Sequence, residues 1–315
     1  MKVSLITTVL NEEKSIESFL DSIVNQTKRP DEVVIVDGGS KDQTIRNIKY
    51  QISLRFAAKI KNKNLNIKII QKNDLNRSQG RNLGIKIAKG DQIAVTDAGC
   101  VLDKSWLAEI TRPFVDQKVM CVAGFYRPVA ETIFQKCLAP YVCVMEGGRD
   151  FLPSSRSFAF RKEVWEKVGG YPEELNFCED LVFDQKIKKA GFNFYFAPKA
   201  IVYWQMRKNL PEAFKQLFNY ATGDGQVFFS PFQTHSKRIA LIFLRYFIFI
   251  ALVVRNVGVI GGLIIMVFLY LAWAVGKNYR FVKNWRAFYF LPMIQITADI
   301  AVILGVINGF LKKGC

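Results

Sequence analysis

The chain has 315 residues, of which 50% are hydrophobic and 23% are charged, with 44 Lys and Arg residues against 27 acids. The net charge of +17 favours anionic partners, but no basic run is interleaved with aromatic residues, so we expect phosphorylated ligands and a membrane surface and no nucleic-acid partner. Six scattered cysteines without a CxxC pair match neither a zinc site nor a disulfide framework.

Short apolar runs alternate with amphipathic segments in the N-terminal part of the chain. Buried strands are predicted at Val3–Leu10, Val33–Val36, Ile67–Ile70 and Ile93–Thr96. A helix is predicted after the first strand from apolar residues at helical spacing, namely Ile16, Phe19, Leu20, Ile23 and Val24. A second helix carries Ile45, Ile48 and Ile52, and a third is predicted near Gln79–Ala88. Strands and helices that alternate at about thirty-residue spacing indicate an α/β fold with a mainly parallel sheet flanked by helices.

The pattern is less regular between residues 119 and 205. Strands are predicted at Val119–Phe125 and Phe194–Ala197, and helices at Lys162–Val168 and Leu181–Ala190. We expect a mixed sheet in this region, which would cover one side of the preceding α/β domain.

The last quarter of the chain has a different composition. Ile239–Cys315 contains eight basic residues and a single acid, Asp299. We therefore divide the chain into a soluble domain at residues 1–238 and a membrane-anchoring region at residues 239–315, with two or three hydrophobic helices. Tyr220–Gly225, which is rich in glycine and lacks the lysine of a phosphate-binding loop, is interpreted as a loop that leads toward the membrane.

Three apolar segments are candidates for crossing the bilayer. Val257–Gly276 has no charge and is long enough, whereas Ile239–Val254 carries Arg245 and could instead lie in the membrane plane. The third candidate, Ala287–Leu311, contains a proline and Asp299. Four basic residues within Lys277–Arg286 predict that this connection is cytoplasmic.

The localisation follows from the same features. The N-terminus, MKVSLITTVLNEE, has a short apolar stretch that runs into acids without a small-residue cleavage site, so it is interpreted as a strand and not as a signal peptide. We expect a multi-pass membrane protein with a cytoplasmic catalytic domain.

Carboxylates stand where predicted strands end. Asp37 follows the second strand and precedes two glycines, and Asp97 follows the fourth strand. Open α/β sheets bind ligands at this edge, so we expect a nucleotide held by Asp37 and Asp97, with chemistry near Asp180. Three acids also have a structural alternative: Asp37 could cap a turn, and Glu179 and Asp180 could stabilise a helix N-terminus.

Six segments together resemble the family 2 glycosyltransferases of the GT-A fold. They are TTVLNEEKSIESFLDSIVNQT, DEVVIVDGGSKDQT, RSQGRNLGIKIAKGD, VTDAG, VGGYPE and CEDLVFDQKIKKAG, and they occur in the family's order over about residues 1–204. The resemblance implies a nucleotide-sugar donor, inversion at the anomeric carbon and, in most members, a divalent cation such as Mg²⁺ or Mn²⁺.

The resemblance also implies roles for residues that bind the nucleotide. Asp37 matches the aspartate that contacts the base. Thr7, Thr8 and Glu12 lie where the family has nucleotide contacts, although Glu12 could equally favour the start of a helix. Arg81 could place a positive charge beside the diphosphate or could serve as a structural ion-pair partner.

The remaining matches concern the metal and the base. Asp97 matches the first position of the Asp-x-Asp motif and is the expected metal ligand, whereas Gly99 replaces the second aspartate, which puts metal dependence in doubt. Asp180 matches the general base that deprotonates the acceptor hydroxyl, and Glu179 before it is expected to contact the nucleotide-sugar.

We therefore expect an inverting enzyme that transfers one sugar to an acceptor hydroxyl on a lipid-linked or membrane-proximal glycan. Tyr203–Phe214 (YWQMRKNLPEAF) lacks the Gln-x-x-Arg-Trp motif of processive synthases, which favours single transfer. Two alternatives stay open: a polyprenyl-phosphate glycosyltransferase, whose anionic acceptor needs no strong base, and a catalytically silent nucleotide-binding membrane protein.

Overall fold

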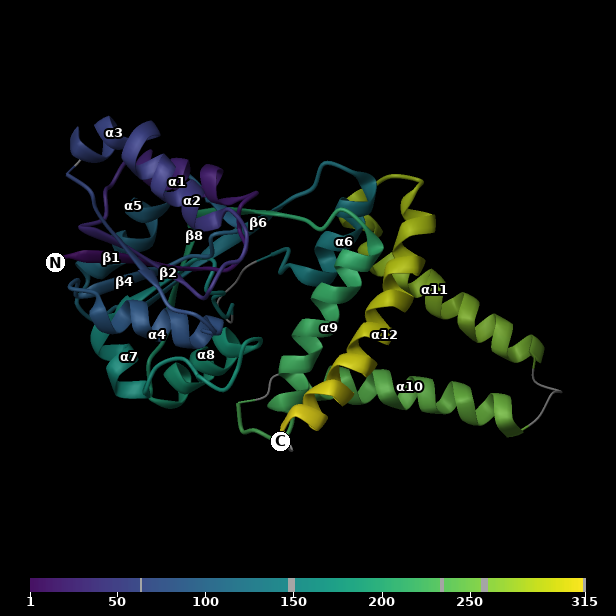
Figure 1. Ribbon diagram of the computed structural model, residues 1–315. Coiled ribbons are helices and arrows are strands. Elements are labelled where there is room, and N and C mark those ends of the chain that lie inside the picture. The colour runs from purple at the N-terminus through teal and green to yellow at the C-terminus, as the bar shows by residue number, and fades with distance from the viewer. Residues whose placement is uncertain (63, 147–150, 233–234, 256–259, 314–315) are drawn as a thin grey trace. The chain divides into compact units, whose positions relative to one another are not determined.

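The computed structural model describes residues 1–62, 64–146, 151–232, 235–255 and 260–313. The chain forms two compact units, drawn in Figure 1. The first comprises Met1–Pro128 and Glu146–Gln205, and the second comprises Val129–Met145 and Met206–Cys315. The second unit therefore takes in residues on both sides of the boundary that the composition suggests after Arg238.

The first unit is built on an eight-stranded sheet in the order β3-β2-β1-β4-β7-β6-β8-β5. The strands are β1 (Val3–Val9), β2 (Glu32–Asp37), β3 (Asn66–Gln71), β4 (Gln92–Val95), β5 (Cys100–Leu102), β6 (Cys121–Val129), β7 (Phe158–Arg161) and β8 (Phe194–Gln205). Strands β3, β2, β1 and β4 pair in parallel, whereas β7 pairs antiparallel with β4 and β6, and β5 pairs antiparallel with β8. The predicted α/β class is confirmed, with a mixed sheet whose parallel half comes from the N-terminal part of the chain.

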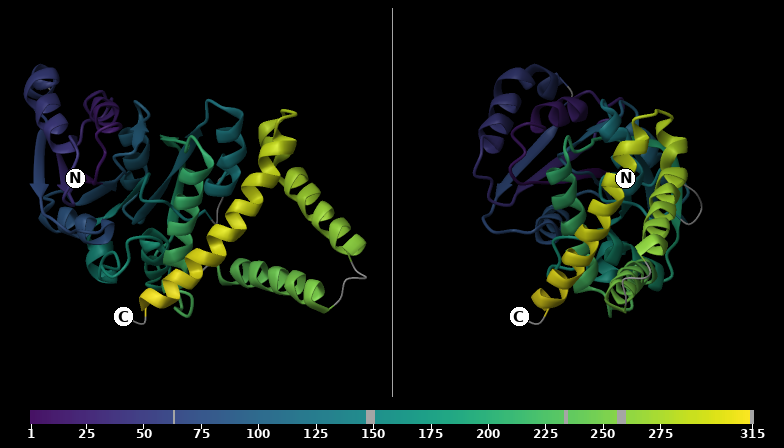
Figure 2. Two further views of the ribbon diagram at one scale, coloured as in Figure 1. Left: turned by 45° about the vertical axis from the view of Figure 1, so that its right-hand side comes forward. Right: turned by 90° about the vertical axis from the view of Figure 1, so that its right-hand side faces the viewer.

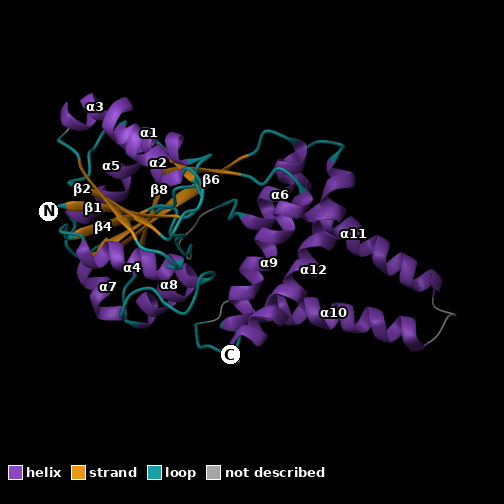
Figure 3. Cartoon of the chain, in the orientation of Figure 1, coloured by secondary structure: helices purple, strands orange, loops and turns teal. Residues whose placement is uncertain are grey.

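Helices cover both faces of this sheet, as Figure 3 shows. They are α1 (Ile16–Val24), α2 (Thr44–Tyr50), the π-helical η1 (Gln51–Arg55), α3 (Ala57–Asn62), α4 (Arg77–Ile87), α5 (Trp106–Thr111), the 3₁₀ turn η2 (Arg112–Val115), α7 (Lys162–Val168) and α8 (Glu179–Lys189). The central strands β1 and β2 are buried on both faces, which accounts for their mostly apolar sequences.

Helix α4 lies unusually close to the sheet. A Cβ atom on Gly80 would stand 2.8 Å from Cγ2 of Thr8, and one on Gly84 would stand 2.7 Å from Cγ2 of Ile6. Only glycine allows this approach without displacing the strand. The close packing places Arg81, which follows Gly80, beside the carboxyl ends of the parallel strands.

The second unit consists of helices. They are α6 (Ile133–Val142), α9 (Leu210–Gln226), α10 (Ser236–Arg255), α11 (Ile260–Val282) and α12 (Ala287–Lys313), of which the last four are seen from two further sides in Figure 2. The prediction of a loop at Tyr220–Gly225 is wrong, because these residues belong to α9. Gly225 packs against the backbone carbonyl of Val306, so its lack of a side chain serves contact between α9 and α12 and does not break the helix.

The same contact predicts the effect of adding a side chain to α12. A Cβ at Gly305 would lie 2.5 Å from the carbonyl oxygen of Phe218 and 2.7 Å from Cβ of Ala221. Gly305→Val should therefore push the helices apart and destabilise the second unit by about 1–3 kcal/mol. The melting temperature of the detergent-solubilised chain measures this loss. Gly276→Val in α11, where a Cβ would meet open space, is the matched control and should leave the melting temperature nearly unchanged.

Asp299 ties three of the helices together. Its carboxylate accepts hydrogen bonds from Tyr246 (3.1 Å), Tyr270 (2.5 Å) and Gln295 (3.1 Å), and it pairs with Arg245 at 2.9 Å. A carboxylate that is 2% exposed needs such partners to remain in an apolar surrounding. The acid and the arginine that interrupt the apolar segments are therefore partners of each other.

The apolar segments of the second unit expose much of their surface. One helix among the described residues, at Ala287–Lys312, has the length and hydropathy of a membrane span. Large apolar side chains are also exposed on the two preceding helices, among them Leu241, Phe247, Ile250, Ile264, Phe268 and Leu269. Part of the predicted span Val257–Gly276 lies outside the described residues.

Candidate active site

The carboxyl ends of the parallel strands meet at one edge, as predicted. Asp37, the last residue of β2, pairs in register with Val9 of β1 and Gln71 of β3. Its carboxylate accepts hydrogen bonds from the backbone N–H of Gly39 (3.3 Å) and from the backbone and hydroxyl of Ser40 (3.2 Å and 2.5 Å). Asp37 therefore holds the β2–α2 loop in shape, and it is only 2% exposed.

The neighbouring β1–α1 loop is joined to the same region. The backbone N–H of Glu12 donates to Oγ1 of Thr44 at 2.7 Å, and the backbone N–H of Asn11 donates to Oγ of Ser40 at 2.9 Å. Glu12 is partly exposed, and its carboxylate lies near Gly99, two residues after Asp97. Thr7 is fully buried within β1, and among the described residues its hydroxyl has no hydrogen-bond partner.

Arg81 bridges two of the predicted site carboxylates. Its guanidinium contacts Oδ1 of Asp97 at 2.8 Å and Oε1 of Glu179 at 2.6 Å. The side chain of Arg81 is 2% exposed, whereas that of Asp97 is 29% exposed. Burial opposes ionisation of Asp97, but Arg81 outweighs it and, together with Arg156, holds the pKa of this carboxyl below its usual value. Arg81 therefore makes the structural ion pairs that the sequence left open as one of its two possible roles.

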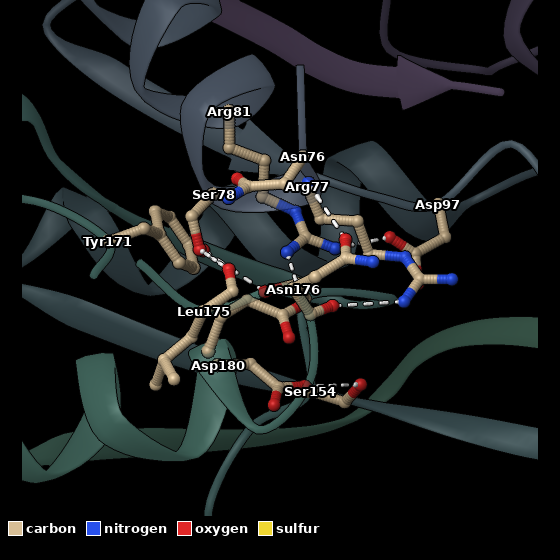
Figure 4. Close-up of polar contacts among 12 residues, drawn as sticks. Asn76, Arg77, Ser78, Arg81, Asp97, Ser154, Tyr171, Leu175, Asn176 and Asp180 are labelled. Carbon is tan, nitrogen blue, oxygen red and sulfur yellow. Dashed lines mark hydrogen bonds and ion pairs between the residues drawn. The ribbon is translucent and has the colours of Figure 1, made fainter. Parts of the chain in front are cut away.

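The loop before Asp180 is fastened to the start of α4, as Figure 4 shows. The hydroxyl of Ser78 donates to the carbonyl of Leu175 at 2.8 Å, and the amide of Asn76 donates to the carbonyl of Glu173 at 2.6 Å. These bonds connect residues that are almost a hundred positions apart in the sequence. They fix where the chain enters α8 and hence where Asp180 stands.

Asp180 lies in the first turn of α8. Cys178, immediately before the helix, adopts a left-handed conformation with φ of 65°, which side-chain-bearing residues seldom adopt. Oδ1 of Asp180 accepts a hydrogen bond from the backbone N–H of Leu181 at 2.9 Å, and Oδ2 accepts one from the hydroxyl of Ser154 at 3.3 Å. The carboxylate is partly exposed, so it is accessible to an acceptor hydroxyl.

Arg156 is the site residue that the sequence did not indicate. Its Nη1 donates to Oγ of Ser154 at 2.8 Å, and its Nε lies 4.0 Å from Oδ2 of Asp97. The guanidinium carbon stands 3.9 Å from the centroid of a Trp204 ring. Arg156 therefore lies between Asp97 and the serine that contacts Asp180. The segment PSSRS carries no motif, so only the folded chain reveals this position.

Asp184 is a second buried acid on α8, one turn beyond Asp180. Burial, with a further contribution from Asp180, raises its pKa well above the ordinary value of 3.8. Its Oδ2 is buried and has no hydrogen-bond partner among the described residues. The folded chain therefore holds Asp184 in its neutral form to a higher pH than the unfolded chain does.

This raised pKa gives a test by pH. Above pH 3.8 the unfolded chain releases the proton that the folded chain keeps, so Asp184 lowers stability increasingly as pH rises toward its folded-state pKa. Asp184→Asn removes the ionisation and should raise the melting temperature at pH 8 by about 2–4 °C, with a smaller gain at pH 5. A gain that is equal at both pH values would show that ionisation of Asp184 is not the cause.

The residues around Asp97 fit a resident divalent cation poorly. Such an ion takes several oxygen ligands, but both oxygens of Asp97 face guanidinium groups and position 99 offers no side chain. The carboxylate of Glu12 lies 3.8 Å from where a Cβ of Gly99 would stand, yet it already accepts a hydrogen bond from Ser15. Within the described part of the chain, no three His, Cys, Asp or Glu side chains form a group that could hold a metal ion.

Comparison with solved structures gives the fold. The mannosyltransferase PcManGT from Pyrobaculum calidifontis, solved with GDP-Man and Mn²⁺, matches 98% of this chain and 86% of its own with a TM-score of 0.60 and 18% identity. TarS 1-349 from S. aureus, solved with UDP-GlcNAc, matches 96% of this chain and 89% of its own with a TM-score of 0.52 and 18% identity. At 18% identity these matches show a shared fold and nothing more. The predicted GT-A fold is confirmed.

Sequence comparison then gives the family. Residues 4–156 match the model of glycosyl transferase family 2. The O-antigen chain rhamnosyltransferase RfbN of Salmonella typhimurium is 25% identical over 234 residues, which are 70% of this chain and 71% of that protein. The poly(ribitol-phosphate) β-N-acetylglucosaminyltransferase TarS of Staphylococcus aureus is 30% identical over 198 residues, but these are only 32% of that protein. Residues 4–156 thus form a domain that matches glycosyl transferase family 2, and with these relatives the chain is a glycosyltransferase.

Proposed function

We propose that this chain is an inverting glycosyltransferase that moves one sugar from a nucleotide-sugar to an acceptor hydroxyl on a membrane-associated glycan of the cell envelope. The observation that carries the proposal is the placement of Asp180 at an accessible helix start, connected through Ser154 and Arg156 to Asp97. The relatives RfbN and TarS are named for transfer to O-antigen chains and to poly(ribitol-phosphate), which supports an envelope glycan as the acceptor class.

The nucleoside would bind at the carboxyl edge of the parallel strands. Asp37 closes the β2–α2 loop there, and the base would donate hydrogen bonds to its carboxylate, as the resemblance implies. Glu12 stands on the adjoining loop, which is tied to α2 through Thr44. Thr7 and Thr8 would act mainly by shaping the end of β1, because the side chain of Thr7 is buried.

The reaction would be a single displacement. The acceptor oxygen forms a bond to the anomeric carbon while the bond from that carbon to the diphosphate oxygen breaks, and the electron pair leaves with the nucleoside diphosphate. Asp180 takes the proton of the acceptor hydroxyl, since an alcohol becomes an effective nucleophile as its proton departs. Arg81 and Glu179 hold Asp97 and the start of α8 in the required positions.

A divalent cation on the donor would contact this chain through Asp97, and it would supply positive charge to the leaving diphosphate. The structural relative PcManGT was solved with Mn²⁺. Because the ligands around Asp97 are few, none of the steps above depends on that cation.

The second unit would anchor the enzyme at the bilayer. The apolar helix Ala287–Lys312 and the exposed apolar side chains of α10 and α11 support membrane binding. The basic connection Lys277–Arg286 would lie on the cytoplasmic side, where nucleotide-sugars are available, and two or three helices would cross the membrane. This arrangement favours a lipid-linked acceptor, whose sugar stands close to the membrane surface.

The donor can be identified by thermal stabilisation. The purified chain in detergent is melted with UDP-, GDP-, dTDP- and CMP-linked sugars, each at a saturating concentration. A ligand that binds only the folded state raises stability by about 2.7 kcal/mol at a hundred times its Kd, so one donor should stand out. If none of these donors shifts the melting temperature and none is hydrolysed, the proposed function fails.

A further inference from the structure

Two arginines approach Asp97, and they differ in what they can reach. Arg81 is 2% exposed and contacts both Asp97 and Glu179 at short distances. The side chain of Arg156 is 16% exposed, and its closest approach to Asp97 is 4.0 Å. Arg81 is therefore enclosed by carboxylates, whereas Arg156 can meet a ligand at the surface of the site.

The position of Arg156 is fixed from two sides. Its guanidinium lies over Trp204 at 3.9 Å and beside Tyr126 at 5.4 Å from the ring centroids. Stacking on aromatic rings leaves the N–H groups at the rim of the guanidinium plane available for hydrogen bonds. One of these groups donates to Ser154, which in turn donates to Asp180. A charge held in this way needs little reorganisation when a ligand arrives.

The site is acidic, so a bound diphosphate needs a further positive charge beside it. Asp97, Glu179 and Asp180 are acidic, and Arg81 is already shared by two of them. A nucleoside diphosphate adds further negative charge close to Asp97. The second aspartate of the Asp-x-Asp motif would normally help to hold a cation for this purpose, and Gly99 stands in its place.

We infer that Arg156 binds the diphosphate of the donor and neutralises the charge that develops on it when the bond to the sugar breaks. The inference rests on the proposed function, because it assigns a residue of the same site. The electron pair of the broken bond passes to the outer phosphate, and the guanidinium of Arg156 donates hydrogen bonds to that phosphate. Arg156 thereby performs in this chain the task that a cation held by two aspartates would perform, so binding of the diphosphate does not require a metal.

The test compares ligands with and without phosphates. UDP, GDP and dTDP are first screened, and the diphosphate that stabilises the wild-type chain most is titrated beside its nucleoside, both in EDTA and with Mn²⁺. Arg156→Met keeps a long unbranched side chain at this position but removes the charge. The substitution should lower the affinity for the diphosphate by about ten- to a hundred-fold and leave the affinity for the nucleoside unchanged, because only the phosphate contact is lost. Arg156→Lys keeps a point charge without the planar fork, so its affinity for the diphosphate should lie between those of wild type and Arg156→Met.

Arg127→Ala is the matched control, since Arg127 follows Tyr126 on β6 and is exposed. It should change neither affinity. For wild type, EDTA should leave the diphosphate affinity nearly unchanged. If Arg156→Met lowers the affinities for nucleoside and diphosphate equally, Arg156 has a structural role and the inference is overturned. Loss of diphosphate binding by the wild-type chain in EDTA would also overturn it. If no diphosphate binds the wild-type chain at all, the proposed function fails instead.

Discussion

Asp180→Asn is expected to lower the rate of sugar transfer by about a hundred- to ten-thousand-fold while the affinity for the donor stays unchanged. The amide has the size of the carboxylate and can keep the contact with Ser154, but it cannot take the proton of the acceptor hydroxyl. Turnover and donor affinity are measured separately on the same preparation, so that loss of binding is not mistaken for loss of chemistry.

Asp91→Asn, at an exposed position of the same residue type, serves as the control and should behave as wild type. Turnover of Asp180→Asn near the wild-type level would remove Asp180 from the mechanism. It would also favour the polyprenyl-phosphate alternative, because an anionic phosphate acceptor reacts without a strong base.

Arg81→Leu is expected to produce the largest loss of stability. The substitution leaves Asp97 and Glu179 without the cation that both contact, and Glu179 is only 5% exposed. Removing one partner of a buried ion pair costs about 3–5 kcal/mol, a large part of the stability of most domains. The melting temperature and the yield of soluble protein in detergent measure this effect.

A second substitution separates charge from packing. Glu179→Gln, combined with Arg81→Leu, removes one of the two carboxylate charges that have lost their partner and should restore part of the lost stability. Arg46→Leu on α2, where the side chain is exposed, should have little effect. If the double variant is no more stable than Arg81→Leu alone, the loss comes from packing and the ion pairs contribute little.

The parallel half of the sheet could be predicted because its signal is local. The apolar runs at Val3–Leu10, Val33–Val36, Ile67–Ile70 and Ile93–Thr96 correspond to β1, β2, β3 and β4 within a few residues. Strands β1, β2 and β4 are buried on both faces and are therefore mostly apolar, a signal that is visible without any knowledge of their neighbours. The acids at the ends of β2 and β4 then follow from the chain order.

Other elements depend on contacts that the sequence does not display. Strand β7 (Phe158–Arg161) is short, and its place between β4 and β6 is set by pairing with distant residues. The glycines of α9 resemble those of a turn, and only the approach of α12 shows that they permit close packing. The contacts of Arg81 with Glu179 and of Arg156 with Asp97 join segments that are far apart in the chain.

The central claim is that this chain transfers sugar from a nucleotide-sugar to a membrane acceptor with Asp180 as the base. Membranes that contain the wild-type chain or Asp180→Asn are incubated with the radiolabelled donor that stabilises the protein, and label in the organic-extractable lipid fraction is counted. The account predicts label in that fraction for wild type and a large loss for Asp180→Asn. A donor that binds both proteins equally but labels no acceptor in either would contradict the account and indicate a nucleotide-binding protein without transferase activity.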